Sequence, residues 1–224
     1  MFVATKEYLD GIKQFLMSDK ASLCSNIAEL YEIFPHNNNI LTDFLINVAE
    51  LDPQSLVDNI SEIRDVLPNR MFERIDCGSF SLIIPSSIKS FQDYSFAHSS
   101  LKKFYYIEND TYKAGKINNG AFYECSDLTY VDISQADMIG LAAFEGCVNL
   151  KSINCPNVRE IRNEAFVGCK SLRNLVLPKL IWFDIRAFNE CQHITLSISK
   201  DVISDWTSKE VDKLKRQVNK LILL

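Results

Sequence analysis

Apolar positions recur every 22 residues through the second half of the chain. The recurring segment has the form Ala-Phe-x-x-Cys, and its copies read AFYEC, AFEGC, AFVGC and AFNEC. The columns that keep this interval are Phe122, Phe144, Phe166 and Phe188; Cys125, Cys147, Cys169 and Cys191; Leu128, Leu150, Leu172 and Ile194; and Ile117, Ile139, Ile161 and Phe183. A unit of this length cannot bury its apolar side alone, so neighbouring units must stack on each other. The pattern predicts a solenoid of stacked coils.

Each coil is expected to contain one short strand. The last three residues of LTYVDI (128–133) alternate inward, outward and inward, as a β-strand does. LKSINC and LRNLVL repeat this pattern one and two intervals later. A proline, Pro156 or Pro178, follows each of these two strands, where a missing N–H does least harm to the hydrogen-bond ladder.

The units 117–138, 139–160 and 161–182 resemble the BspA-type leucine-rich repeat, whose motif runs AF-x-x-C-x-x-L-x-x-I-x-L-P. The resemblance covers about residues 80–200. It implies an α/β solenoid, a right-handed leucine-rich repeat coil, with a role in adhesion or protein recognition and no catalytic residues.

The outer coils are degraded, as terminal repeats usually are. A coil around Phe96 keeps the pattern, but Ser99 stands where the cysteine should be. Phe96 and the next repeat phenylalanine are 26 residues apart, so four extra residues are expected to bulge out within 108–116. At the other end, Leu196 and Ile198 come one residue early, as expected for a closing coil.

In residues 1–68 the apolar positions do not follow the 22-residue interval but have helical spacing, which predicts an N-terminal helical domain or cap. Two of its helical segments are 40–51 and 55–67, with Asp52 and Pro53 as a break between them. Two more apolar stripes with helical spacing are Tyr8, Ile12, Phe15 and Leu16, and Leu23, Ile27, Leu30, Tyr31 and Phe34. Such stripes are more often core than partner grooves.

A C-terminal capping helix is expected over 207–222, because Thr207 and Glu210 form a capping-box signature. Its apolar stripe is Val211, Leu214, Val218 and Leu221. We expect this stripe to cover the open end of the last coil, since the segment is too short for a dimerising coiled coil. The solenoid itself is assigned to 69–204 and the C-terminal helix to 205–224.

The four cysteines of the repeat, Cys125, Cys147, Cys169 and Cys191, form one column, called here the cysteine column. Stacking brings them about 4.8 Å apart, which makes a metal site or a disulfide conceivable. However, a straight column cannot converge on one metal ion, and a disulfide needs Cβ atoms about 3.8 Å apart. Each cysteine also lies between a core phenylalanine and a core leucine, so buried packing with a high thiol pKa is expected.

Composition narrows the class of function. The net charge is −5 and the pI about 5.3, and no cluster of lysine and arginine stands out in the sequence, so nucleic-acid binding is not expected. The N-terminus lacks a secretory signal pattern and no stretch is apolar enough to span a bilayer, so no membrane association is expected. Seven cysteines fit a reducing compartment and a cytoplasmic location, although the family resemblance leaves a surface or secreted location open.

The best candidate for function is the outward side of the strands, expected to be the concave face of the solenoid. The candidate partner-binding residues form three rows across neighbouring coils: Thr129, Lys151 and Arg173; Tyr130, Ser152 and Asn174; and Asp132, Asn154 and Val176. Their mixed polar, basic and aromatic character suits a protein ligand as well as a plain solvated face. The acidic pI favours a basic partner.

A second candidate surface consists of apolar residues at positions that should be polar: Met138, Leu141, Ile181, Trp182 and Ile185. They lie either under the C-terminal helix or in a partner site, and cover by the helix is the preferred interpretation.

These observations predict a non-enzymatic protein-interaction module, of which an inhibitor or effector is one form. The alternative is a structural component of a homo-oligomeric assembly, in which the helical parts dock copies together. No catalytic residues, cofactor or metal are predicted, and a small-molecule ligand is not favoured. The histidines His36, His98 and His193 have no repeated relation to a cysteine or serine.

Overall fold

The computed structural model describes residue 31 and residues 38–47, 50–61, 66–68, 70–76, 78–85, 87–106, 115–191 and 193–224. Apart from Tyr31, the apolar stripes predicted between residues 8 and 34 lie outside the described residues. So does most of the insertion predicted within 108–116.

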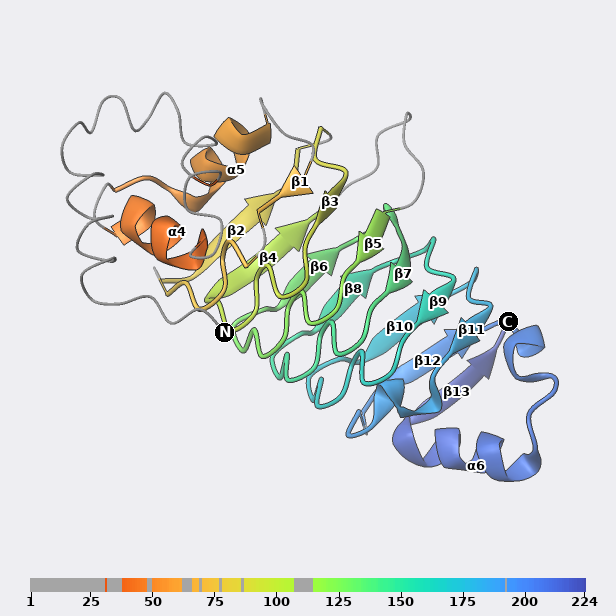
Figure 1. The fold of residues 1–224 in the computed structure, drawn as a ribbon. Helices are drawn as coiled ribbons and strands as arrows, with labels where there is room; N and C mark the ends of the chain where they lie inside the picture. The colour runs from red at the N-terminus through yellow and green to blue at the C-terminus, as the bar shows by residue number, and fades with distance from the viewer. Residues whose placement is uncertain are drawn as a thin grey trace, which may run out of the picture.

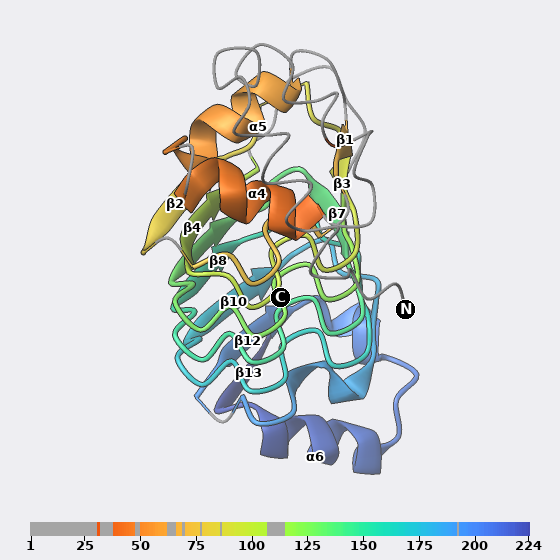
Figure 2. The same ribbon diagram turned by 60° about the vertical axis from the view of Figure 1, so that its left-hand side comes forward.

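Parallel strands from successive coils stand side by side along the stack (Figure 1). The seven-stranded sheet consists of β2 (Phe80–Ile83), β4 (Leu101–Tyr105), β6 (Tyr130–Asp132), β8 (Ser152–Asn154), β10 (Asn174–Leu177), β12 (Thr195–Ile198) and β13 (Lys220–Leu223). A four-stranded sheet contains β5 (Gly115–Ile117), β7 (Ala136–Ile139), β9 (Glu160–Ile161) and β11 (Trp182–Phe183), and a two-stranded sheet pairs β1 (Val66–Leu67) with β3 (Ser90–Phe91). Each coil of the regular repeat thus contributes a strand to both larger sheets. Figure 2 shows the seven-stranded sheet on one side of the stack and strands β1, β3 and β7 on the other.

The strand registers follow the sequence interval. Tyr130 pairs with Ser152 and Ser152 with Asn174, so residues 22 apart are neighbours across the sheet. The predicted strand in LTYVDI is confirmed, with Val131 fully buried between two partly exposed neighbours. β10 pairs with β12 one residue early, Leu175 beside Leu196, as the shortened last coil predicts.

A column of stacked phenylalanine rings runs through the core. Successive ring centroids are 5.0–5.8 Å apart and the rings are within 16° of parallel. The members of this phenylalanine column are Phe72, Phe96, Phe122, Phe144, Phe166 and Phe188, all with 0% exposure. The sequence predicted the column from Phe96 onwards, and Phe72 adds one more ring from a coil whose motif is too degraded to recognise.

The turns that carry the phenylalanine column need left-handed backbone at fixed positions. The residue two places after the ring has a positive φ in every coil; these residues are Arg74, His98, Glu124, Gly146, Gly168 and Glu190. Only glycine adopts this conformation without a steric penalty, because it has no Cβ.

Gly168→Ala is therefore expected to lower the free energy of unfolding by about 1 kcal/mol. The added Cβ would meet only the Gly146 backbone at 3.8 Å, an ordinary contact, so the loss comes from the φ of 72°. Urea denaturation measures it. The opposite change at another left-handed residue, Glu164→Gly (φ 59°), should not lower the free energy of unfolding. An unchanged free energy of unfolding in Gly168→Ala would contradict this view of the turn.

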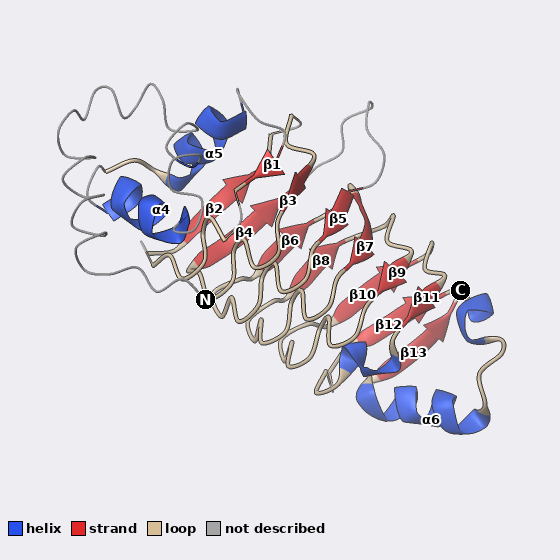
Figure 3. Cartoon of the chain, viewed as in Figure 1, coloured by secondary structure: helices blue, strands red, loops and turns tan. Residues whose placement is uncertain are grey.

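Two helices are described at the N-terminal end of the stack, α4 (Asn38–Asn47) and α5 (Pro53–Ser61) (Figure 3). The predicted break lies between them. The carboxylate of Asp52 accepts hydrogen bonds from the backbone N–H groups of Gln54 and Ser55, so Asp52 caps α5. The prediction of a helix through 67 is wrong at its end, because Val66–Leu67 forms strand β1 and pairs with β3. β-branched Val66 fits that strand.

α5 contacts β1 and β2, and its buried residues belong to the same apolar core as the coils. The side chain of Gln54 also occupies the free edge of β2. Its Oε1 accepts from the Ile83 N–H and its Nε2 donates to the Ile83 carbonyl, both at 2.7 Å. A side-chain amide thus satisfies the edge groups that a further strand would otherwise pair.

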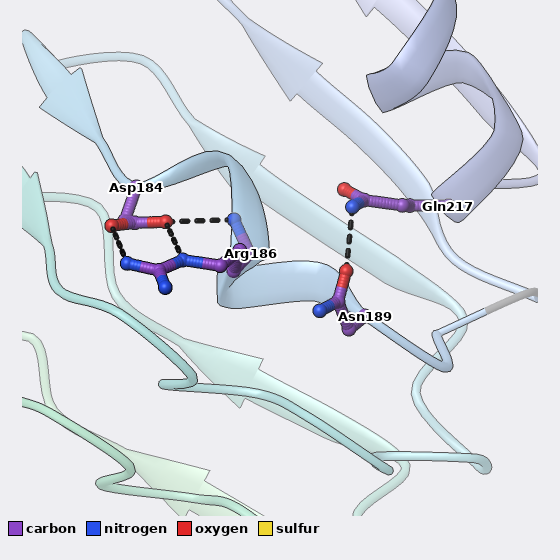
Figure 4. A network of polar contacts seen from close by, with 4 residues as sticks. All are labelled: Asp184, Arg186, Asn189 and Gln217. Atoms are coloured by element: carbon purple, nitrogen blue, oxygen red, sulfur yellow. Dashed lines mark hydrogen bonds and ion pairs between the residues drawn. The ribbon is translucent and has the colours of Figure 1, made fainter.

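At the C-terminal end, the chain forms the short 3-10 helices η1 (Ile185–Phe188) and η2 (Lys200–Ile203), then helix α6 (Ser208–Gln217). The capping box is confirmed: the Glu210 carboxylate accepts from the Thr207 N–H, and the Thr207 hydroxyl oxygen accepts from the Glu210 N–H. Leu214 is fully buried in the core. Gln217 donates to Asn189, next to the Asp184–Arg186 pair that begins η1 (Figure 4).

The prediction that this helix continues to 222 is wrong. It ends at Gln217, and Lys220–Leu223 forms β13, which pairs with β12. Val218 and Leu221 have helical spacing, but the unpaired edge of β12 offers hydrogen bonds that an exposed helix end lacks. Among the described residues, no helix has the length and apolar character needed to cross a membrane.

Candidate interaction face of the seven-stranded sheet

The side chains on the outward side of the seven-stranded sheet form two rows, called here the sheet face, and all of them except Ser197 are at least partly exposed. The first row is Ser81, Lys103, Tyr130, Ser152, Asn174, Thr195 and Lys220; the second is Ile83, Tyr105, Asp132, Asn154, Val176, Ser197 and Ile222. Six of the nine predicted partner-binding residues lie in these rows. The other three, Thr129, Lys151 and Arg173, directly precede β6, β8 and β10, and each has some exposure. The structure thus brings all nine together.

The middle of the sheet face carries a polar network centred on Asp132. The Asn154 amide donates to Asp132 Oδ2 at 2.9 Å and the Tyr130 hydroxyl to the same oxygen at 3.4 Å. The Ser134 N–H donates to Asp132 Oδ1 at 3.1 Å. Partial burial and the nearby Asp132 carboxylate raise the pKa of Tyr130. The network holds these side chains in place, so this part of the face is preorganised.

Aromatic and aliphatic side chains are exposed beside this network. The rings of Tyr105 and Tyr130 are 5.4 Å apart between centroids. Val176 is 54% exposed and Ile83 is 58% exposed. Exposed apolar groups next to fixed polar groups are typical of protein-binding surfaces.

The sequence interpretation did not identify Lys103, Tyr105, Lys220 or Ile222 as part of the same face. Lys103 and Tyr105 lie in β4, whose coil precedes the insertion and departs from the 22-residue interval. Lys220 and Ile222 lie in β13, where a helix was expected. The KKFYY segment after Leu101 was the available signal, since it aligns with LTYVDI once the insertion is allowed for.

Three of the five residues of the second candidate surface are not covered by α6, contrary to the preferred interpretation. Leu141, Ile181 and Trp182 are 41%, 56% and 46% exposed. α6 contacts η1 instead, and Trp206 packs on Phe183 with ring centroids 5.0 Å apart. The cover prediction is wrong for these three residues, because the helix ends early and its stripe lies at the end of the last coil, where η1 contains Ile185.

Trp182 is instead paired with a charged neighbour. The guanidinium of Arg162 lies over the Trp182 ring, 5.4 Å from its centroid, and also pairs with Glu160 at 2.8 Å. The stacking covers one side of the indole and leaves the other side for solvent.

The cysteine column is buried, as predicted, and each thiol makes a hydrogen bond that the sequence did not reveal. Cys147 Sγ donates to the carbonyl oxygen of Phe122 in the preceding coil at 3.0 Å. The other three thiols donate to the corresponding phenylalanine at 2.8–3.1 Å. This contact explains why the repeat uses cysteine rather than another small apolar residue.

Burial sets the chemistry of these thiols. It raises the pKa of Cys125 and Cys191 to about 12, and the pKa values of Cys147 and Cys169 lie well above their usual range. A thiol that stays protonated is a poor nucleophile and a poor metal ligand. Within the described residues, no group of histidine, cysteine and acidic side chains is arranged to hold a metal ion.

Coils with a parallel strand, a buried phenylalanine turn and a cysteine column define the class as a leucine-rich repeat protein. The chain belongs to the BspA type leucine rich repeat family, whose model matches six copies over residues 33–136 and 115–204.

Among solved structures, the crystal structure of a leucine rich repeat protein from T. pallidum is similar to this chain, with 26% sequence identity and a TM-score of 0.41. The match covers 55% of this chain and 50% of that chain, so this chain spans about half of its length. No curated protein matches the sequence.

Proposed function

We propose that this chain is a non-enzymatic protein-interaction module that binds a macromolecular partner through the sheet face. The observation that supports this most is the contrast between the two sides of the same strands. Val131 and Leu175 are fully buried, whereas Ser152, Asn174 and Val176 are exposed. Leucine-rich repeats generally mediate protein–protein contacts, and an inhibitor or effector role is one form of this function.

We also propose that the two ends of the stack are caps. Gln54 occupies the edge of β2 at one end, and Leu214 of α6 is buried against the last coil at the other. Terminal caps of this kind keep a solenoid soluble, because they cover core that the next repeat would otherwise bury. In this proposal the N-terminal helical part (1–68), the solenoid (69–204) and the C-terminal segment (205–224) form one folding unit.

The alternative, a structural component of a homo-oligomeric assembly, has less support. It needs the apolar stripe of α6 to be free for a second copy, but Leu214 and Val218 are 0% and 5% exposed. A size measurement in solution separates the two functions: a monomer favours the interaction module, and a closed oligomer that buries α6 favours the assembly.

Affinity capture from the source cells tests the proposed function. The double variant Tyr130→Ala with Arg173→Ala should capture at least about tenfold less partner than the parent chain, because both side chains lie on or beside the middle of the sheet face. The matched control, Lys209→Ala with Lys213→Ala, changes two exposed residues of α6 and should capture normally. Equal loss in both variants, or none in either, would contradict the proposal.

A cytoplasmic location is also a proposal. The five described cysteines are free thiols, which suits a reducing compartment. Fractionation of the source cells tests the location directly.

A further inference from the structure

We propose that the partner presents an acidic, extended segment that lies across the strands of the sheet face. This inference rests on the proposed function and specifies the chemistry of the partner. It differs from the expectation that the acidic pI favours a basic partner, because the charge of the sheet face is opposite to the charge of the whole chain.

Most of the charged side chains on the sheet face and on the strand starts beside it are basic. The exposed basic residues there are Lys102, Lys103, Lys151, Lys170, Arg173 and Lys220. The acidic residues in the same area are Asp76, which holds in its own coil the repeat position of Lys170, Asp127, which precedes β6, and Asp132. Asp132 already accepts hydrogen bonds from Tyr130, Asn154 and Ser134, so its oxygens are occupied within the face, although its charge remains. The basic side chains still outnumber the acidic ones.

The basic side chains are available to a ligand. Within the described residues, none of the ion pairs involves one of these lysines or Arg173. Arg173 donates one hydrogen bond from Nη1 to the Lys170 carbonyl at 2.9 Å. A guanidinium has five N–H donors, so most of them remain free for a carboxylate, with the side chain held in one orientation.

The negative net charge of the chain arises outside the sheet face, in residues 1–68, which hold 11 acidic and 4 basic residues, whereas residues 69–224 hold 18 acidic and 20 basic residues. Within the solenoid, one set of acidic residues also lies away from the sheet face. Glu124, Glu145, Glu164 and Glu190 all belong to the phenylalanine turns, at or next to the left-handed positions. Partial burial, followed by repulsion from the other three carboxylates, raises the pKa of Glu145, which shows that these groups are close together. The chain therefore separates an acidic set of turns from a basic sheet face, and a partner is steered by the local field.

The dimensions of the face suit an extended segment. From Lys103 in β4 to Lys220 in β13 there are five strand-to-strand steps, which is about 24 Å at the usual strand spacing. An extended peptide covers this distance with about seven residues. Its carboxylates would meet Lys103, Lys151 and Arg173, while an apolar or aromatic side chain would pack on Tyr130 or Val176.

Fluorescence anisotropy with synthetic peptides tests the inference on the full chain. The probe is a short fluorescein-labelled peptide of glutamates interrupted by one tyrosine and one leucine. The comparison probes are the same peptide with lysine in place of glutamate, and a labelled oligothymidine. We expect the glutamate peptide to bind best, with an affinity that falls as NaCl rises from about 50 to about 200 mM, because salt screens exposed charges.

The decisive variant is Lys103→Glu with Lys151→Glu and Arg173→Glu. It should lower the affinity for the glutamate peptide by at least about tenfold. Its matched control is Lys209→Glu with Lys213→Glu and Lys215→Glu, the same change of charge on exposed positions of α6. Circular dichroism checks that both variants are folded. The control should bind the glutamate peptide within about twofold of the parent, apart from the general effect of net charge.

Four results would overturn the inference. They are no binding of the glutamate peptide, tighter binding of the lysine peptide, tighter binding of oligothymidine, and equal weakening by the control variant. Failure of this inference can be distinguished from failure of the proposed function. If the capture experiment still depends on Tyr130 and Arg173 while the glutamate peptide fails to bind, the sheet face is a binding face but its partner is not acidic.

Discussion

Phe144→Ala is expected to lower the free energy of unfolding by about 3–5 kcal/mol, the range for removal of a fully buried phenylalanine ring. Phe144 is 0% exposed and its ring stacks between those of Phe122 and Phe166, at 5.0 and 5.4 Å. The cavity would lie in the middle of the phenylalanine column, where neither neighbour can move to fill it. Each ring is held by its own coil, so the structure relaxes little.

The backbone around Phe144 makes local relaxation still harder. Its N–H donates to the Ala165 carbonyl at 2.8 Å, and its carbonyl accepts from the Cys169 thiol at 3.1 Å. Urea denaturation followed by circular dichroism measures the change. Leu141→Ala is the matched control in the same coil, because Leu141 is 41% exposed and should change stability by less than about 0.5 kcal/mol. A loss below about 1 kcal/mol for Phe144→Ala would contradict the stacked register.

Alkaline pH is expected to unfold the chain through its buried thiols. Burial raises the pKa of Cys125, Cys155 and Cys191 to about 12, and it raises the pKa of Cys147 and Cys169 well above the usual range. The thiol pKa in an unfolded chain is about 8.5. The folded value is the higher one, so the stabilising contribution is complete below about pH 8.5 and disappears as the pH rises towards about 12.

Raising the pH from about 7.5 to about 10 should remove about 2 kcal/mol per buried thiol, or roughly 10 kcal/mol for the five. A typical domain has only about 5–15 kcal/mol of stability, so unfolding near pH 10 is expected. Urea denaturation at the two pH values measures the loss. An unfolding free energy at the higher pH within about 1 kcal/mol of that at the lower pH would contradict the burial of the thiols.

Cys147→Ser is the variant that assigns the effect to a single thiol. Serine already occupies this position in an outer coil, where the buried Ser99 hydroxyl donates to the carbonyl of Phe96 in its own coil at 2.7 Å, so a serine here finds a hydrogen-bond acceptor, although not the one in the preceding coil that Cys147 uses. Because a hydroxyl does not ionise in this range, the variant should lose about 2 kcal/mol less than the parent over the same pH interval.

The sequence predicted those parts of the fold in which one side chain has one role in every coil. The phenylalanine column, the buried cysteines and the alternating strands follow directly from the 22-residue interval, since equivalent residues must meet equivalent neighbours. The capping box at Thr207 was also predictable, because its two hydrogen bonds are local.

The parts that the sequence did not predict depend on contacts between distant segments. The apolar spacing of Val218 and Leu221 fits a helix, and only the open edge of β12 makes Lys220–Leu223 a strand. The exposure of Trp182 could not be foreseen for the same reason, because it depends on where α6 ends. The Cys147 thiol hydrogen bond needed the relative position of two coils.

The sequence predicted the residues at the centre of the sheet face but not those on its outer strands. The nine residues chosen from regular coils all lie on or beside the sheet face, because their outward positions repeat with the interval. Lys103 and Lys220 were missed because an insertion and a change from helix to strand precede them. The predicted preference for a basic partner used the charge of the whole chain, which is negative because residues 1–68 hold 11 acidic and only 4 basic residues, and which therefore does not describe the sheet face.

Site-specific photo-crosslinking in the source cells tests the proposed role of the sheet face most directly. A photoreactive amino acid is placed at Ser152, which is exposed at the middle of the sheet face, and in a second variant at Ser208, which is exposed at the start of α6. We expect a covalent adduct with a partner protein from position 152 and none from position 208. An adduct from position 208 alone would contradict binding through the sheet face.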